Sequence, residues 1–291
     1  MKYILFPGCT VLAKDPGFEA SAARIFEILG VEFENEPNFH CCAPTIVSSV
    51  QVNTAYALAA RNLCLAEEKN LDIITLCSGC FKNLKKVNAH LKEDEEDRIA
   101  INDILNEIGK EFKGTIEVKH FVQVLYEDIG LEKIKENVKR PLSDMVFATF
   151  YGCHLIRPHE VVKFDDPEFP RSMDEIVEAL GAKTVEYDGK YTCCGAGLQG
   201  VNDTATLEIP RQKLIALKTL DLDGLVLACP TCYFTFDLGQ FDIQRKYKEQ
   251  YQVAPLHLTE VLGIAFGLEL KSIGMNLHRI KPKKIMAKMK A

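Results

Sequence analysis

The feature that most constrains this chain is a pattern of five cysteines that occurs twice. Each pattern consists of a single cysteine, an adjacent Cys-Cys pair and a Cys-x-x-Cys pair. In both patterns 34 residues separate the two pairs, and an offset of 152 residues relates the last four cysteines. The first set is Cys9, Cys41, Cys42, Cys77 and Cys80, and the second set is Cys153, Cys193, Cys194, Cys229 and Cys232. The repeat predicts a duplicated chain with two similar halves.

The segments around the cysteines predict an α/β fold. Short apolar runs precede the single cysteines and the Cys-x-x-Cys pairs, at residues 3–6, 71–76, 145–150 and 222–228. Stretches with helical spacing alternate with them, at residues 18–29, 54–68, 81–91, 209–219 and 233–247, with Pro210 in the first turn of the fourth. Such alternation favours βαβ units. We therefore expect two tandem, pseudo-symmetric βαβ-type domains with mostly parallel sheets.

The repeat also sets the expected domain boundaries. We predict a first cysteine-rich domain over residues 1–140, a second over residues 141–270 and a basic C-terminal tail over residues 271–291. Residues 131–141, with four Lys or Arg residues and a proline, are expected to connect the domains. The tail carries seven Lys or Arg residues and no acidic residue. It is interpreted as a weakly amphipathic docking arm for a partner, as a flexible solvated segment or as a membrane-surface helix.

Composition narrows the classes of function. The formal net charge of −6 argues against general affinity for nucleic acid. The clearest apolar run near the C-terminus, residues 261–268, is too short to cross a bilayer, and the N-terminal sequence has no signal-peptide pattern. We therefore expect a cytoplasmic location, where structural disulfides are disfavoured. Eleven cysteines in that compartment indicate metal binding or redox chemistry.

The expected fold places most of these cysteines at a binding edge. Four of them follow a predicted strand directly, and these are Cys9, Cys77, Cys153 and Cys229. They therefore belong to the carboxyl edges of the sheets, where open α/β folds bind ligands. Each Cys-x-x-Cys pair also opens a predicted helix, whose free N–H groups stabilise thiolates. The eleventh cysteine, Cys64, lies in a helical pattern and is expected to be a small buried apolar side chain.

Three kinds of site compete for the two sets. A redox dithiol needs two cysteines and tetrahedral zinc needs four, whereas each set holds five. Neighbouring side chains in an extended chain point to opposite sides, so an adjacent Cys-Cys pair fits a polynuclear iron–sulfur centre better than a single ion. The second pair is followed by Gly195, Gly197 and Gly200, which allow close backbone approach, whereas Ala43 and Pro44 follow the first. Iron–sulfur clusters are favoured, and zinc and dithiols stay open.

The spacing of both sets resembles the cysteine-rich CCG domain, here as a tandem pair. Residues 1–268 are similar to the B subunit of heterodisulfide reductase from methanogens. The resemblance implies two noncubane [4Fe-4S] clusters, one for each set of five cysteines, facing each other across the domain interface. It also implies reduction of the coenzyme M–coenzyme B heterodisulfide to two thiols, with each cluster taking one product sulfur. The first pair departs from the family pattern because it reads Cys-Cys-Ala rather than Cys-Cys-Gly, but no cysteine is missing.

The same resemblance implies partner proteins. These are the iron–sulfur C subunit and the A subunit, which carries flavin and iron–sulfur clusters, coupled to a hydrogenase or a formate dehydrogenase. The sequence contains no ferredoxin-type cysteine run, no GxGxxG after a strand and no recognisable flavin site, so we expect no flavin or nicotinamide on this chain. Tandem CCG domains also occur in lactate-, glycolate- and glycerol-3-phosphate-oxidising systems, where they look like electron-transfer subunits. That alternative stays open.

Four further residues are candidates for the reaction. His154 is the candidate for giving a proton or a hydrogen bond to a departing thiolate, the alternative being a hydrogen bond to cluster sulfur. The family's substrate carries anionic groups, so Arg157, Lys82 and Arg211 are candidate ligands, and each is otherwise a surface residue.

Three other features have a structural interpretation. His120 and His257 repeat at a strand-to-helix junction in both halves, and they are expected to cap helices or to be buried and hydrogen-bonded. The acidic run over residues 93–97 is expected to be a solvated helix start.

Overall fold

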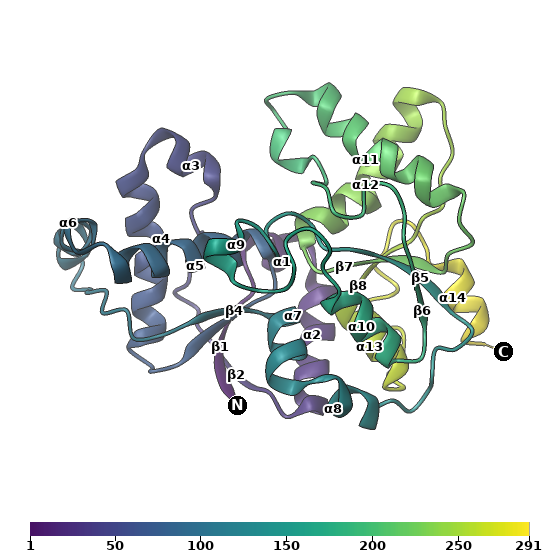
Figure 1. The fold of residues 1–291 in the computed structure, drawn as a ribbon, viewed down its shortest axis with the longest axis horizontal. Helices are drawn as coiled ribbons and strands as arrows, with labels where there is room; N and C mark the ends of the chain where they lie inside the picture. Colours follow the sequence, from purple (N-terminus) through teal and green to yellow (C-terminus); the bar gives the residue numbers. More distant parts are fainter. Residues whose placement is uncertain (291) are drawn as a thin grey trace.

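The computed structural model describes residues 1–290 and contains two parallel four-stranded sheets (Figure 1). The first sheet has the order β2-β1-β3-β4 and the second has the order β6-β5-β7-β8. The strands are β1 (Lys2–Phe6), β2 (Glu32–Asn35), β3 (Asp72–Thr75), β4 (Val118–His120), β5 (Val146–Phe150), β6 (Lys183–Val185), β7 (Gly224–Leu227) and β8 (Pro255–His257). Both sheets have the same topology, and all neighbouring strands run parallel. The predicted α/β fold with two pseudo-symmetric βαβ-type units is confirmed.

Helices connect the strands in both halves. The helices of the first half are α1 (Cys9–Lys14), α2 (Pro16–Leu29), α3 (Thr45–Val50), α4 (Val52–Glu67), α5 (Ser78–Glu93), α6 (Glu95–Asn106), α7 (Phe121–Gln123), which continues as a π-helical turn (Val124–Ile129), and α8 (Leu131–Glu136). Those of the second half are α9 (His159–Val162), α10 (Ser172–Ala179), a 3-10 turn (Ala196–Leu198), α11 (Asp203–Lys218), α12 (Pro230–Tyr247), α13 (Leu258–Ala265) and α14 (Lys283–Lys288).

The two halves share a layer of helices that lies between the sheets (Figure 1). Within it α2 packs against α13, and α8 packs against α10. The strands alternate between this layer and the outer helices: Tyr3 and Leu5 belong to the shared core, whereas Ile4 and Phe6 belong to the outer one. The repeats are therefore joined through one apolar core rather than through a short linker.

The expected connector and tail take part in this packing. Residues 131–136 form α8, and its Ile134 is fully buried, so the segment is more than a linker. Ile280 and Ile285 of the basic tail are also buried, and the Asp237 carboxylate accepts the backbone N–H groups of Arg279 and Ile280. Gly274 also packs closely against Gly17 of α2, so up to residue 290 the tail contacts both halves and is not a flexible extension; residue 291 lies outside the described residues.

The start of α11 differs from the prediction. The helix begins at Asp203, so Pro210 lies in its middle rather than in its first turn. The Asn202 side chain accepts the N–H of Ala205 at 3.0 Å and caps the helix there. This cap is the stronger start signal, although the proline removes one hydrogen bond within the helix. None of the helices formed by residues 1–290 combines the length and the apolar character that crossing a membrane requires.

Candidate metal centre

Both cysteine sets gather at the carboxyl edges of their sheets, as predicted. Cys9 begins α1 shortly after β1, and Cys77 and Cys229 follow β3 and β7. Cys77 is the N-terminal cap residue of α5, and Cys229 has the same place on α12. The first turns of two helices therefore direct unpaired N–H groups toward the thiols, an environment that favours thiolates.

The thiols of the first set form a continuous group. The Cys42 thiol neighbours those of Cys41 and Cys80, and the Cys80 thiol neighbours that of Cys77. Cys9 lies beside Cys41. Cys42, Cys77 and Cys80 are buried, whereas Cys9 and Cys41 are exposed, so the group has a buried side and an open side.

The second set repeats this arrangement. The Cys193 thiol neighbours those of Cys153 and Cys194, with 4.0 Å between the sulfurs of Cys153 and Cys193. The Cys232 thiol neighbours those of Cys194 and Cys229. As in the first set, the Cys-x-x-Cys pair, here Cys229 and Cys232, is buried, whereas Cys193 is exposed. Each set therefore joins five thiols in a chain of neighbours, more than one tetrahedral ion uses, which fits a polynuclear group.

The two sets meet at their innermost members. The thiols of Cys77 and Cys229 neighbour each other across the pseudo-symmetry axis, and both residues are buried. All ten predicted cysteines therefore belong to two adjoining groups, while Cys64 lies apart from them. Cys64 is 2% exposed in α4, and burial raises the pKa of its thiol to about 12, as expected for an inert apolar side chain.

Two glycines allow the backbone to close on the thiols. A Cβ placed on Gly8 would lie 3.0 Å from the Cys80 sulfur, and one placed on Gly152 would lie 3.3 Å from the Cys232 sulfur. Both glycines have positive φ, at +83° and +70°. Each precedes the single cysteine of its set, so both halves need a residue without a side chain at the same place. Such a cradle fits a compact group held by the surrounding sulfurs.

The Cys-Cys pairs are held differently in the two halves. The buried Asn62 amide donates to the carbonyl oxygens of His40 and Cys41, at 3.2 and 3.3 Å, and Asn83 donates to the Cys42 sulfur at 3.9 Å. The neighbouring Cys41 and Cys80 thiols lower the pKa of the Cys42 thiol.

In the second half, the residue at the place of Asn62 is Leu214, and the Gly195 N–H donates to the Cys193 sulfur at 3.3 Å. Gly195 has φ +86°, so the glycine after the second pair has the conformational role that its position suggested. Ala43, at the equivalent place after the first pair, also has positive φ, at +53°. The replacement of glycine by alanine therefore leaves the local turn in place.

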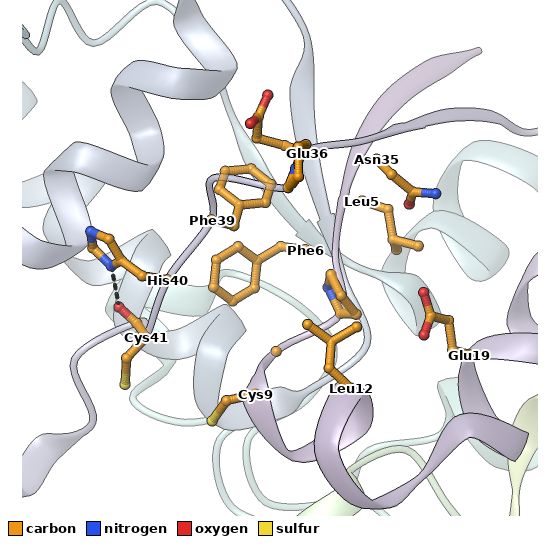
Figure 2. Close-up of a pocket in the computed structure, with 13 residues that line it drawn as sticks. Leu5, Phe6, Cys9, Leu12, Glu19, Asn35, Glu36, Phe39, His40 and Cys41 are labelled. Carbon is orange, nitrogen blue, oxygen red and sulfur yellow. Dashed lines mark hydrogen bonds between the residues drawn. The ribbon is translucent and has the colours of Figure 1, made fainter.

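A cavity opens on the exposed flank of the first set (Figure 2). It has a volume of about 320 Å³. Cys9 and Cys41 border it, and its walls are largely apolar, with Phe6, Leu12 and Phe39 among them. This flank of the first set is accessible from outside the molecule.

His154 and Lys82 lie between the two sets. Lys82 is on α5 of the first half and donates to Thr45 Oγ1 at 3.0 Å, and His154 belongs to the loop that carries Cys153. Helix α9, in that same stretch of the second half, packs against α5. Burial and the nearby Lys82 ammonium lower the pKa of His154, which also neighbours Cys229. Burial likewise lowers the pKa of Lys82.

The two arginine candidates are engaged elsewhere. The Arg157 guanidinium donates to the carbonyl oxygens of Pro167 and Tyr191, at 2.7 and 3.0 Å, and so anchors its loop. The Arg211 guanidinium pairs with Glu249 and Glu208. Its position on α11 gives no support to a role as substrate ligand, because its donors are already used by carboxylates.

The repeated histidines are buried and bonded, as predicted. His120 Nδ1 accepts the N–H of Val122 at 3.3 Å and caps the following helix. The His257 ring pairs with Asp15 at 2.8 Å, and its backbone N–H donates to Glu260 at 2.8 Å. No sequence pattern pointed to Asp15, which comes from the other half.

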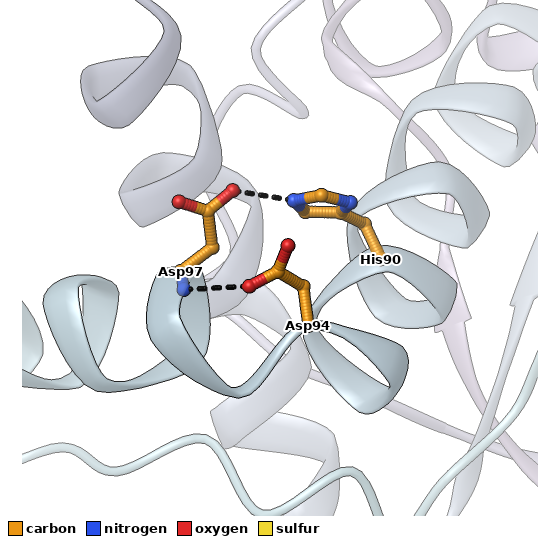
Figure 3. Close-up of side chains that lie close together, drawn as sticks. All are labelled: His90, Asp94 and Asp97. Atoms are coloured by element: carbon orange, nitrogen blue, oxygen red, sulfur yellow. Dashed lines mark hydrogen bonds and ion pairs between the residues drawn. The ribbon is translucent and has the colours of Figure 1, made fainter.

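The acidic segment is a capped helix start, as predicted. Asp94 accepts the N–H of Asp97 at 2.9 Å, and His90 lies 2.5 Å from the Asp97 carboxylate (Figure 3). These three side chains lie on the surface at the junction of α5 and α6, away from the cysteines. Their hydrogen bonds account for their positions.

Comparison with known proteins gives consistent matches. The cysteine-rich CCG domain model matches residues 3–85 and 147–237. The chain is 38% identical over 291 residues to the B subunit of the ferredoxin/F(420)H(2)-dependent CoB-CoM heterodisulfide reductase of Methanosarcina acetivorans, a match that covers 99% of this chain and 97% of the relative. It is 30% identical over 284 residues to the "8-methylmenaquinol:fumarate reductase membrane anchor subunit" of Wolinella succinogenes, a match that covers 98% of this chain and 99% of that one.

A solved structure shares the fold. The crystal structure of a hypothetical protein from Helicobacter pylori superposes with a TM-score of 0.77 at 17% sequence identity and covers 96% of this chain. The chain spans about half of that protein, 52% of its length. At this level of identity the likeness concerns the fold.

Proposed function

Because the chain belongs to the cysteine-rich CCG domain family, together with the B subunits of heterodisulfide reductase, we propose that it is the catalytic subunit that reduces the coenzyme M–coenzyme B heterodisulfide. The family role is that of an iron–sulfur, disulfide-reducing oxidoreductase, and this chain shares it. The reaction consumes one disulfide, two electrons and two protons and yields two thiols.

One observation carries the proposal: ten thiols form two adjoining groups that meet at Cys77 and Cys229. Five thiols per group, closed by Gly8 and Gly152, support one noncubane [4Fe-4S] cluster in each group. Such clusters transfer single electrons, and two of them supply the two electrons that a disulfide requires. Zinc, a closed-shell ion, has no electron to supply.

Lys82 and His154 are the residues placed to act on the substrate. The Lys82 ammonium lies within electrostatic reach of Cys42 in the first set and Cys153 in the second, and it is suited to hold an anionic group of the disulfide. His154 lies near Lys82 and near cysteines of both sets, and it is suited to give a hydrogen bond or a proton to a departing thiolate. Arg157 supports this arrangement indirectly, because it anchors the loop that carries His154.

Electrons come from other proteins in this proposal. The heterodisulfide reductase relatives are B subunits, which implies a complex of several chains. We propose the iron–sulfur C subunit as the direct donor, the flavin-containing A subunit behind it, and a hydrogenase or formate dehydrogenase as their source. The exposed flank of the first set, at Cys9 and Cys41, is a place where such a donor could approach. A cytoplasmic location is part of the same proposal, since ten free thiols suit a reducing compartment.

The test is a metal and sulfide analysis followed by a substrate experiment. The full chain is purified under anoxia, and we expect about eight iron and eight sulfide per chain, from two four-iron clusters. Zinc in place of iron would exclude the proposal. The heterodisulfide is then added to the oxidised protein, and a new paramagnetic species is expected in the electron paramagnetic resonance (EPR) spectrum.

A second function is favoured by the match to the fumarate reductase subunit of Wolinella succinogenes. In that case the two clusters would pass electrons to or from another acceptor, like the CCG subunits of lactate-, glycolate- or glycerol-3-phosphate-oxidising systems. Iron analysis would give the same result for both functions. Only the heterodisulfide reductase is expected to show a spectral response to the heterodisulfide, so an iron-loaded protein without that response would support the second function.

A further inference from the structure

Lys213 is a buried lysine without an acidic partner. The described residues contain two buried lysines, Lys190 and Lys213, which are 1% and 4% exposed. Lys190 is paired with Asp174 and Glu186, at 2.9 and 2.6 Å. The Lys213 ammonium has only the carbonyl oxygen of Ile209, at 3.4 Å on the preceding turn of α11. Among the described residues no carboxylate lies within 4.0 Å of it.

The fold holds this side chain in place. A Cβ placed on Gly189 would lie 3.0 Å from Lys213 Cγ and 3.5 Å from its Cε. Gly189 also has φ +90°, a conformation that other residues rarely adopt. Gly189 therefore provides a slot for the stem of the lysine, between α11 and the loop that leads to the second Cys-Cys pair.

Lys213 lies close to the second set, because Ile209, whose carbonyl oxygen it contacts, packs against Gly195, the residue after Cys194. Burial lowers the pKa of Lys213, and the thiolates of Cys194, Cys193 and Cys232 act against that shift. Glu186 and Asp188 line a surface cavity that Lys213 also lines, but Glu186 is already paired with Lys190. Three members of one cysteine set are thus close enough to act electrostatically on the Lys213 ammonium.

The energetics require a counter-charge. An ammonium that is buried without a partner costs several kcal/mol, because it loses its hydration. Cysteines that bind iron are deprotonated, so a loaded second set carries the negative charge that Lys213 lacks elsewhere.

The first half has no equivalent of this lysine. The residue at the same place, 152 positions earlier, is Arg61, which is only partly buried. Its guanidinium donates to the backbone oxygen of Asn38 at 2.9 Å. Both residues are cations, so the two halves differ in the burial of the cation: Arg61 is partly exposed, whereas Lys213 is buried.

We propose that Lys213 is a positioning residue for the second site, where it serves as a counter-ion. Its positive charge strengthens the binding of the negatively charged cluster and raises the reduction potential of that cluster. The inference rests on the proposed clusters. Reducing a cluster adds one negative charge, and a fixed cation close by in a medium of low dielectric favours the reduced form.

The test compares Lys213→Met with Lys213→Arg in the full, iron-loaded chain. EPR-monitored redox titration gives the potential of each site, and the signal that disappears in Cys194→Ser identifies the second site. At a fixed potential, Lys213→Met is expected to lower the ratio of reduced to oxidised second site about tenfold, which corresponds to about 59 mV. The first site should not change. Lys213→Arg keeps the charge and should keep the potential.

A second readout separates this role from a structural one. Without iron, Lys213→Met should be as stable as the parent chain or more stable, because an unpaired buried charge has been removed. With iron, it should lose the metal of the second site to a chelator faster than the parent. Arg61→Met is the matched control and should change neither measurement at the second site.

Two results would overturn the inference, and they are distinguishable. Iron-loaded Lys213→Met with an unchanged potential at the second site would exclude the role of Lys213 and leave the proposed function intact. Absence of iron from the parent chain would exclude both. If Lys213→Met does not fold, Lys213→Gln replaces it in the same measurements.

Discussion

Cys77 and Cys229 occupy the same place in the two repeats, and their thiols neighbour each other. Each residue follows a central strand, β3 or β7, and is the N-terminal cap residue of the next helix, α5 or α12. Because equivalent residues contact each other, a pseudo-two-fold axis passes between them. The outer members of each set form a pair of their own, Cys9 with Cys41 in the first half and Cys153 with Cys193 in the second.

The cysteine assignment predicts an effect confined to one site. In Cys194→Ser the second set loses a buried thiolate, and we expect about half of the iron and the loss of one EPR signal, together with loss of turnover. Iron analysis and EPR spectroscopy of the anoxic protein provide the measurement. Cys64→Ser is the matched control: it is also buried but lies outside both sets, and it should keep its full iron content. Full activity of Cys194→Ser would contradict the assignment.

The close approach at Gly8 predicts that even alanine is too large there. Gly8 has φ +83° and ψ +153°, a region that only glycine adopts easily, and a Cβ would lie 3.0 Å from the Cys80 sulfur. We expect Gly8→Ala to lower the free energy of unfolding by about 1–3 kcal/mol and to deplete the first site of iron.

Gly30→Ala is the control for backbone strain alone. Gly30 also has positive φ, at +74°, but nothing lies within 4 Å of its Cβ position. We expect a loss of about 1 kcal/mol in chemical denaturation and an unchanged iron content. Equal iron content in both glycine variants would argue against a cradle at Gly8.

The position of Lys82 predicts a substrate effect that depends on charge. Lys82→Met should raise KM for an anionic disulfide about tenfold, because one charge-assisted hydrogen bond is lost. With an uncharged disulfide, KM should not change. Arg211→Met is the control, since its guanidinium is held by Glu249 and Glu208, and it should behave like the parent in steady-state assays. If Arg211→Met raised KM and Lys82→Met did not, the anion site would be assigned to Arg211 instead of Lys82.

The buried pair of His278 and Glu260 predicts a pH-dependent stability. Burial lowers the pKa of His278, but the Glu260 carboxylate 2.7 Å away, with Asp237 and Asp15 nearby, outweighs burial, so the pKa is raised above 6.5. The stabilisation is therefore complete below about pH 6.5 and is lost as the pH rises through the raised value.

His278→Gln is expected to remove this dependence. Urea unfolding of the parent between about pH 6 and pH 9 should show a decreasing free energy of unfolding, and the variant should show a flatter profile over the same range. His257 and Tyr233 pack close to this pair and are unchanged in the variant. A parent profile that is flat or rises with pH would contradict the assignment.

Much of the fold could be predicted because the repeat carries local signals. Apolar runs before Cys9 and Cys77 identified β1 and β3, and the position of each Cys-x-x-Cys pair identified the start of a helix. The packing of α2 against α13 could not be predicted in this way, since an apolar helix face does not specify which other helix covers it. The buried tail was missed for a similar reason: seven basic residues concealed a few apolar side chains, such as Ile285, that pack inward.

The candidate site was predicted to a similar extent. The structure gathers the ten cysteines that their spacing singled out, and His154 and Lys82 lie near both sets. Lys213 was not found, because a lysine in an amphipathic helix is normally solvated and its burial depends on a loop from elsewhere. Arg211 illustrates the converse: a basic residue in the right segment points to carboxylates that the sequence did not identify as partners.

The helical layer shared between the sheets has a consequence for the history of the chain. Helix α2 of the first repeat packs against α13 of the second through apolar side chains. Two separate repeats packed in this way would form a closed symmetric dimer. A dimer of a single-repeat ancestor would have had two identical cysteine-lined pockets. After fusion into one polypeptide the two pockets no longer had to be identical. Each acquired its own neighbouring residues: Thr10 and Arg61 in the first half, His154 and Lys213 in the second.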